Sequence, residues 1–193
     1  MINNSIGTHF EKQQHIPVTI PNIISIIRLA MVPYIVWTLL EERTMLAFVL
    51  FVVVGISDGV DGFIARKFNQ RTELGAYLDP LADKTLLVSM FVVLGYLGNI
   101  PLWLVIFVIT RDVLILAGVM VAFVLGNPIE IKPLFVSKAN TAVQIVLVAL
   151  ALGMPAFGLD LILVQTGIVW ICAILTIASA FAYFAAWTRH VTS

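Results

Sequence analysis

The fold is decided by residues 57–84, SDGVDGFIARKFNQRTELGAYLDPLADK, in which four aspartates stand between two long apolar runs. The first run begins near residue 44, and the second ends near residue 97. A helix of about 20 apolar residues is long enough to cross the hydrocarbon of a bilayer. The sequence therefore predicts two membrane-spanning helices, at 44–67 and 74–97, whose acidic ends meet at one short connection.

The composition agrees with a membrane protein and excludes several other classes. Of the 193 residues, 61% are hydrophobic and 11% are charged, and the mean hydropathy is +1.05. An ordinary globular chain is about 45–50% apolar and about 25% charged. This chain has too few charges to cover a soluble surface, and its net charge of zero gives no basic face. We therefore exclude a soluble domain, a disordered chain, a collagen-like fibre and a nucleic-acid binder.

Four further apolar segments complete the expected architecture. They lie at 20–40, 101–126, 136–156 and 161–187, and turns are expected at 41–43, 98–101, 126–128 and 153–160. The fold class predicted is all-α and polytopic, with six transmembrane helices around a cytoplasm-facing cavity. Residues 1–18 are polar and mixed, so we expect a short segment at the membrane interface, followed by one transmembrane domain at 19–193.

The placement of lysine and arginine predicts the orientation. Cytoplasmic loops carry an excess of these residues, and an even number of spans puts both termini on one side. Arg43 is the only basic residue in the opposite loops. The basic side, which we expect to face the cytoplasm of a bacterial-type inner membrane, carries Lys12, Arg66, Lys67, Arg71, Lys132, Lys138 and Arg189.

Ionisable residues also lie inside or at the edges of the apolar segments. Such groups are costly in a bilayer and mark functional sites by default. They are Arg28, Asp58, Asp61, Asp79, Asp83, Lys84, Arg111 and Asp112. The alternatives are an intramembrane ion pair between Arg111 and Asp112 that binds no substrate, and a carboxylate-based ion carrier. A carrier, however, would need charges near the middle of the membrane, whereas these acids lie near one surface.

The spacing of the aspartates predicts a metal site. Asp58 and Asp61 are three residues apart, and Asp79 and Asp83 are four apart, so each pair shares one face of its helix. Four carboxylates this close cannot all stay ionised without cations. Two divalent ions of the oxygen-preferring type would balance them and could bind a pyrophosphate. Arg66, one turn after Asp61, is placed to pair with a phosphate.

The same residues form a continuous pattern, D-x2-D-G-x2-A-R-x8-G-x3-D-x3-D, from Asp58 to Asp83. This pattern resembles the signature of the CDP-alcohol phosphotransferases, and six spans with the motif across the second and third are that family's layout. The resemblance implies transfer of a phosphoalcohol group from a CDP-alcohol to an acceptor hydroxyl, with release of CMP. It also implies that Asp58, Asp61 and Asp79 bind one Mg²⁺ or Mn²⁺ ion, that Asp58, Asp79 and Asp83 bind a second, and that Asp83 is the catalytic base.

The resemblance implies a nucleotide site as well. The stretch PNIISIIR at 21–28 is similar to the start of the family's first span. Small residues such as Gly75 let a ligand approach the helix closely. The residues expected to contact the substrate on these grounds are Asn22, Ser25, Gly62, Ala65, Arg66, Thr72 and Gly75.

Two later stretches bear on the acceptor. RDVLIL at 111–116 and KPLFVSKANTAVQ at 132–144 resemble the CMP-forming cardiolipin synthases of this family. This resemblance implies phosphatidylglycerol as acceptor. The donor implied is CDP-diacylglycerol, because IPNIISIIRLAMVP at 20–33 and GAYLDPLADK at 75–84 resemble the phosphatidylglycerol branch of bacterial phospholipid synthesis. The alternative is phosphatidylglycerophosphate synthesis, with glycerol 3-phosphate as acceptor. In either case Arg111 and Lys138 are candidates to bind the anionic acceptor. By the same resemblance we expect a homodimer among membrane lipids.

Overall fold

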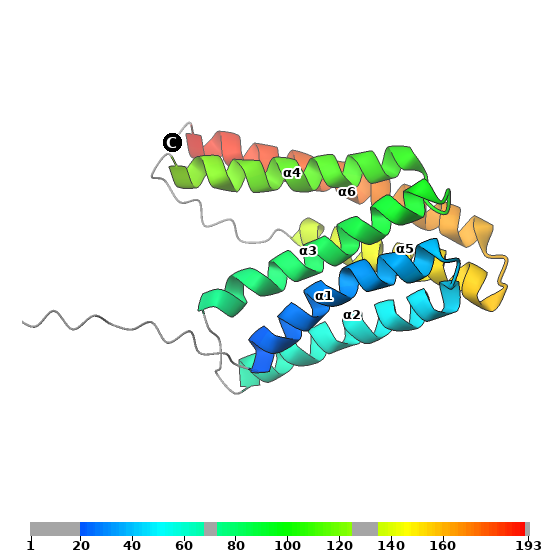
Figure 1. Ribbon diagram of the computed structural model, residues 1–193. Helices are drawn as coiled ribbons and strands as arrows, with labels where there is room; N and C mark the ends of the chain where they lie inside the picture. Colours follow the sequence, from blue (N-terminus) through cyan, green and yellow to red (C-terminus); the bar gives the residue numbers. More distant parts are fainter. Residues whose placement is uncertain (1–19, 68–72, 125–134, 192–193) are drawn as a thin grey trace, which may run out of the picture.

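The computed structural model describes the backbone of residues 20–67, 73–124 and 135–191, and the side chains of residues 26–57, 84–118 and 135–185. Within these ranges the chain folds into six α-helices, so the predicted all-α class is confirmed (Figure 1). The helices are α1 (Ile20–Leu40), α2 (Thr44–Lys67), α3 (Glu73–Tyr96), α4 (Leu102–Val124), α5 (Phe135–Phe157) and α6 (Ile162–Val191). The last helix runs to Val191, beyond its predicted end at 187.

Turns at one end of the bundle connect the helix pairs α1–α2, α3–α4 and α5–α6. Gly98 and Gly158 follow the ends of α3 and α5 with φ angles of 78° and 64°, a conformation that glycine adopts without steric cost. The nitrogen of Asn99 then donates to the carbonyl of Leu94 over 2.9 Å, which closes the end of α3. The turn expected at 153–160 was placed too early, because α5 continues through Gly153 and Pro155 to Phe157.

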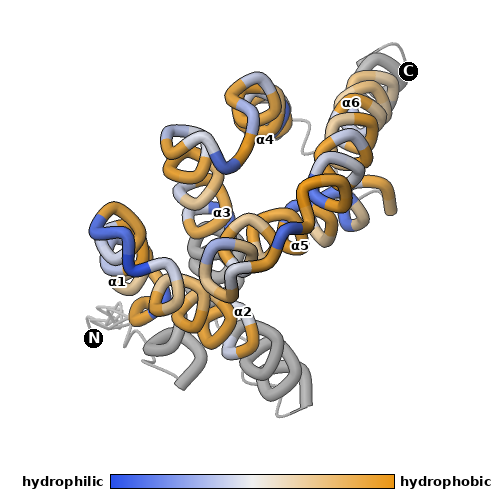
Figure 2. Tube along the Cα trace, turned by 90° about the vertical axis from the view of Figure 1, so that its right-hand side faces the viewer, coloured by the Kyte–Doolittle hydropathy of each residue, from blue (hydrophilic) through white to orange (hydrophobic). Residues whose placement is uncertain are grey.

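The packing of the helices forms two rings that share one side. We call α1, α2, α5 and α3 the first ring, because each of these helices packs on the next and α3 packs on α1. The second ring consists of α3, α4, α6 and α5, packed in that order. Helices α3 and α5 belong to both rings, as the view along the bundle shows (Figure 2).

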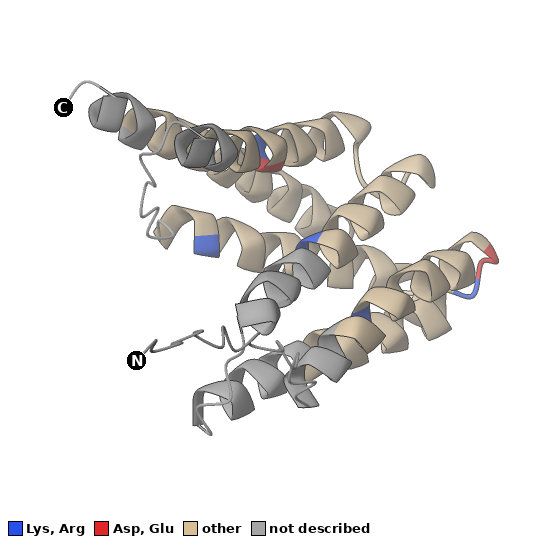
Figure 3. Ribbon diagram, turned by 60° about the vertical axis from the view of Figure 1, so that its left-hand side comes forward, with Lys and Arg blue, Asp and Glu red and all other residues tan. Residues whose placement is uncertain are grey.

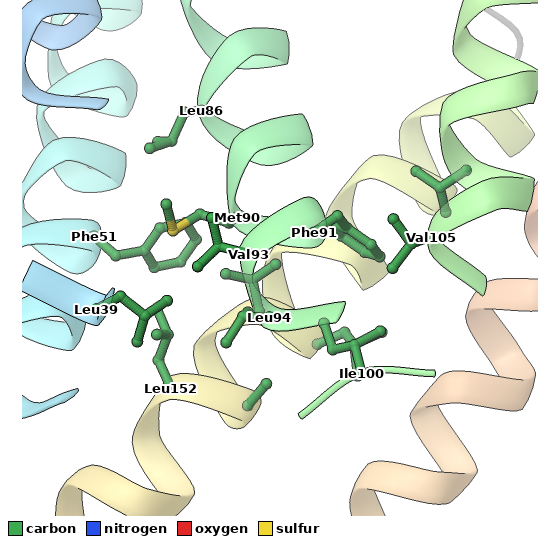
Figure 4. Close-up of a cluster of buried hydrophobic side chains, with 14 of the residues drawn as sticks. Leu39, Phe51, Leu86, Met90, Phe91, Val93, Leu94, Ile100, Val105 and Leu152 are labelled. Atoms are coloured by element: carbon green, nitrogen blue, oxygen red, sulfur yellow. The ribbon is translucent and has the colours of Figure 1, made fainter. Parts of the chain in front are cut away.

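The apolar core lies where these rings meet, towards the end with the short turns. Met90, Phe91 and Leu94 of α3 are at most 1% exposed, as is Leu152 of α5. Phe91 points towards Val105 of α4, while Met90 lies beside Phe51 of α2 (Figure 4). At this end α3 is therefore held on several sides, since it packs on α1, α5 and α4.

The outer surface of the bundle is apolar. Leu163 and Phe181 of α6 are 85% and 70% exposed, and large exposed apolar side chains occur on every helix. Within the part of the chain with described side chains, 135–157 and 162–185 are long and apolar enough to cross a membrane by length and composition. A soluble monomer rarely exposes apolar surface on this scale. These features indicate a membrane protein.

Candidate functional site

A cavity of about 300 Å³ lies within the first ring. All four helices of that ring contribute to its wall, and the lining is apolar except for two side chains, Arg28 of α1 and Thr141 of α5. Arg28 is only 3% exposed, so its charge is held inside the bundle instead of reaching out to the lipid surface. Other lining residues are Phe51 and Val54 of α2, Leu86 and Leu87 of α3, and Ile145 of α5.

Most of the residues predicted from the acidic motif fall outside the described side chains. Asp58 and Asp61 occur in the sequence of α2, and Asp79 and Asp83 in that of α3. The same limit applies to Asn22, Ser25, Gly62, Ala65, Arg66, Thr72 and Gly75. Among the side chains that are described, no three histidine, cysteine or acidic residues come together as a metal site. The predicted metal site therefore stays a prediction.

Arg111, a predicted substrate residue, lies in the second ring and is held by protein groups. Its side chain is 4% exposed. The Nη1 atom donates to Oδ1 of Asp112 over 2.6 Å, and Nη2 donates to Oγ of Ser137 over 2.6 Å and to Oγ of Ser179. The guanidinium also lies 5.6 Å from the ring centroid of Tyr183. Three helices, α4, α5 and α6, thus meet at this one side chain.

Asp112 extends this network to the helix that carries the second acidic pair. Its Oδ2 atom accepts a hydrogen bond from Nζ of Lys84 in α3 over 2.7 Å. The side chain of Asp112 is 14% exposed and that of Lys84 is 41% exposed. The described charges are few and stand on otherwise uncharged helices (Figure 3). The structure shows the expected ion pair between Arg111 and Asp112, with Lys84 as a third member.

Lys138, the other candidate for binding an anionic acceptor, has a different environment. It lies in the first turn of α5 and is exposed. Thr141 and Ile145, which line the cavity, follow it by three and seven residues and therefore share its face of the helix. Of the two predicted cations, Lys138 is the one whose charge is accessible from outside and stands on the cavity side of its helix.

Sequence reasoning missed a second set of buried polar side chains, which belong to α5. Asn140 and Gln144 are 0% and 1% exposed. Oδ1 of Asn140 accepts a hydrogen bond from Oγ1 of Thr176 over 3.1 Å. The amide nitrogens of Asn140 and Gln144 have no hydrogen-bond partner among the described atoms. The available signal was the spacing of the two amides, four residues apart on an apolar helix, which places both on one face.

Comparison with known proteins identifies the family. The family model described as CDP-alcohol phosphatidyltransferase matches residues 18–178. The chain is 39% identical over 186 residues to a protein from Rattus norvegicus named cardiolipin synthase (CMP-forming), and 33% identical over 199 residues to a probable cardiolipin synthase (CMP-forming) from Drosophila melanogaster. It is 36% identical over 182 residues to a chloroplastic CDP-diacylglycerol–glycerol-3-phosphate 3-phosphatidyltransferase from Oryza sativa subsp. japonica.

These alignments cover most of the chain but less than two thirds of each relative. They include 87%, 94% and 85% of the chain in the rat, fly and rice comparisons. They include 61% of the rat and fly proteins and 55% of the rice protein. Since the family model spans the acidic motif and most of all six helices, the chain belongs to the CDP-alcohol phosphatidyltransferase family.

Proposed function

We propose that this protein transfers the phosphatidyl group of CDP-diacylglycerol to the hydroxyl of an anionic, glycerol-containing acceptor and releases CMP. The observation that carries the proposal is the cavity of the first ring, because two of its four walls are the helices that contain the acidic motif. A lipid donor suits a site within an apolar bundle, while CMP has to leave to water.

Helical spacing supports an acidic wall on that cavity. Asp58 follows Phe51 by seven residues and Val54 by four, and both of these residues line the cavity. Asp83 precedes Leu86 by three residues and Leu87 by four, and these also line it. Residues three, four or seven apart share a face of an α-helix. Continued along α2 and α3, the lining faces therefore include the acidic positions.

The donor set fits a pair of Mg²⁺ or Mn²⁺ ions. Four carboxylates supply only oxygen ligands, which these hard cations prefer. Asp58, Asp61, Asp79 and Asp83 would hold the ions, in the two sets of three that the family pattern implies. When bound, divalent ions supply positive charge that stabilises the phosphate oxygens of the donor.

The side chains then have separate tasks. Asp83 accepts the proton of the acceptor hydroxyl, whose oxygen forms a new bond to the β-phosphorus of the donor. The bond from this phosphorus to the bridging oxygen breaks, and CMP leaves with that electron pair. We assign contacts with the nucleotide and its phosphates to Asn22, Ser25, Gly62, Ala65, Arg66, Thr72 and Gly75.

We propose phosphatidylglycerol as the acceptor, which makes the product cardiolipin. This choice is supported by the names of the rat and fly relatives. The rice relative, whose name specifies glycerol 3-phosphate, supports the alternative that the product is phosphatidylglycerophosphate. We assign the negative charge of either acceptor to Lys138, since the guanidinium of Arg111 is already occupied by Asp112, Ser137 and Ser179.

The membrane arrangement is part of the same proposal. The ends of α2, α4 and α6 and the starts of α1, α3 and α5 lie together at one end of the bundle (Figure 1). We propose that all six helices span the membrane, with this basic end and the cavity mouth at the cytoplasmic side of a bacterial-type inner membrane. We further propose an interfacial segment at 1–18, one catalytic domain at 19–193, and a homodimer.

The test is release of CMP by the purified full chain in detergent or liposomes. We expect CDP-diacylglycerol and phosphatidylglycerol to yield CMP and cardiolipin, EDTA to stop the reaction, and added Mg²⁺ or Mn²⁺ to restore it. Asp83→Asn should lose turnover, whereas Asp160→Asn, an acid of the exposed turn after α5, should keep it. Product formed with glycerol 3-phosphate alone would establish the alternative. Absence of CMP release with either acceptor would contradict the transferase and leave the ion carrier.

A further inference from the structure

A chain of ion pairs joins α3 to the rest of the second ring. Lys84 contacts Asp112, and Asp112 contacts Arg111. We propose that Asp112 is a positioning residue, which sets the rotation of α3 through Lys84 and so directs the acidic face of that helix towards the metal ions. The inference rests on the proposed function, since it deepens the role of the same acidic site.

The carboxylate of Asp112 is a fixed point for this contact. Its Oδ1 atom accepts a hydrogen bond from Nη1 of Arg111. The guanidinium also donates hydrogen bonds to Ser137 of α5 and Ser179 of α6. An arginine held at several nitrogens has few rotamers left, because its planar fork fits one geometry. The second oxygen is therefore presented to α3 in one direction, and Lys84 Nζ meets it at 2.7 Å.

The position of Lys84 in α3 makes this contact relevant to the metal site. Lys84 directly follows Asp83 in the sequence. Adjacent residues of an α-helix point about 100° apart, so fixing Lys84 towards α4 fixes the direction of position 83 as well. Leu86 and Leu87, which follow within one turn, line the cavity. The ion pair and part of the cavity lining thus come from the same turn of α3.

A second close contact between α3 and α4 completes the constraint. A Cβ atom placed on Gly95 of α3 would lie 2.7 Å from Cγ2 of Val105 in α4, so the two helices approach closely there. Lys84 and Gly95 are eleven residues apart, or about 16 Å along a helix axis. Contacts at two such separated points fix both the tilt and the rotation of α3 against α4.

The cleanest test removes the lysine and keeps the buried pair. Lys84→Met leaves Arg111 with Asp112, so the half-exposed position loses its ammonium without stranding a buried charge. The measurement is binding of Mn²⁺ to the full chain in detergent, without substrate, followed by the electron paramagnetic resonance signal of free Mn²⁺. We expect Lys84→Met to raise the half-saturating Mn²⁺ concentration fivefold or more, and Lys84→Arg to stay within twofold of wild type.

Three further variants separate positioning from general stability. Asp112→Asn should weaken Mn²⁺ binding as Lys84→Met does, and the double variant should be no weaker than the single ones, since both remove one contact. Thr176→Val removes a buried hydrogen bond between α5 and α6 and serves as the control. It should lower the melting temperature and leave Mn²⁺ binding unchanged.

The outcomes distinguish this inference from the proposed function. Folded Lys84→Met that binds Mn²⁺ like wild type overturns the inference, whatever its melting temperature. Wild-type protein that binds Mn²⁺ through the aspartates but releases no CMP overturns the transferase and leaves the positioning role intact. Wild-type protein that binds no Mn²⁺ overturns both. In the active enzyme, we also expect Lys84→Met to raise the half-saturating Mg²⁺ concentration more than it lowers kcat at saturating Mg²⁺.

Discussion

The Nη2 atom of Arg111 in α4 donates a hydrogen bond of 2.6 Å to Oγ of Ser137 in α5, although 26 residues separate them. This hydrogen bond links α4 to α5, although the described parts of these two helices do not otherwise pack on each other. The guanidinium is 4% exposed, so its partners have to compensate the loss of water around the charge.

Substitution of Arg111 should therefore cost stability more than it changes substrate binding. Arg111→Met leaves the carboxylate of Asp112 with Lys84 alone. Removal of one member of a buried ion pair costs about 3–5 kcal/mol. We expect the midpoint of thermal unfolding in detergent to fall by roughly 6–20 °C for a chain of this size. Arg43→Met in the exposed turn after α1 is the matched control, with a much smaller change. Equal losses in the two variants would contradict the structural role.

The close approach of Gly95 and Val105 predicts a compensating pair. Gly95→Ala adds a Cβ atom 2.7 Å from Cγ2 of Val105, so it should destabilise the bundle by about 1–3 kcal/mol. Val105→Ala removes the atom that clashes, and the remaining neighbours are at ordinary contact distance. In thermal unfolding, the double variant should lose less stability than the sum of the losses measured for the two single variants. Additive losses would show that the two helices do not meet there.

The hydrogen bond between Thr176 and Asn140 predicts that substitutions of these two residues will not have additive effects on stability. Thr176→Val leaves Oδ1 of Asn140 buried without this donor, which costs about 1–3 kcal/mol. Asn140→Leu in the same chain removes that orphaned acceptor and also the amide nitrogen that has no described partner. The double variant should therefore unfold at a higher temperature than Thr176→Val alone. A further fall in the unfolding temperature would mean that the amide has a partner in the folded protein.

Substitution of Lys138 should weaken binding of the acceptor and leave the other properties of the protein nearly unchanged. Because its charge is exposed at the start of α5, Lys138→Ala should leave the melting temperature within about 1 °C of wild type, as most surface substitutions do. We expect the KM for the anionic acceptor to rise several-fold while kcat and the KM for CDP-diacylglycerol change little. Steady-state CMP release at varied acceptor concentration measures this. Lys138→Arg, which keeps the charge, should behave like wild type.

Sequence patterns located the helices well because the signals are local. The segment predicted at 136–156 is α5 (Phe135–Phe157), and that at 44–67 is α2 (Thr44–Lys67). The error at 153–160 has a local cause too. Gly153 and Pro155 are typical turn residues, yet α5 retains both, and the ring of Phe48 lies 3.3 Å from where a Cβ on Gly153 would stand. Glycine there permits close packing of α2 on α5 instead of ending the helix.

Packing partners are less accessible to such patterns. The position of Arg111 and Asp112 in an apolar segment suggests an ion pair between them as one alternative, but it does not indicate Lys84, Ser137 and Ser179, which come from three other helices. Nothing in a nearly uniform apolar run specifies which neighbour a helix faces, because its hydrophobicity is spread around the whole circumference. The acidic motif, in contrast, was visible because charges in such a run are rare.

The sharing of α3 and α5 by the two rings has a consequence for how the protein responds to its ligands. Helices α3 and α5 line the cavity of the first ring and also belong to the second ring, which holds the buried charges around Arg111. Lys84 belongs to α3 and Ser137 to α5, so a ligand in the cavity that shifts either helix would also move part of the network around Arg111. Because Tyr183 contacts the Arg111 guanidinium, its ultraviolet absorption or fluorescence should change when a ligand occupies the cavity.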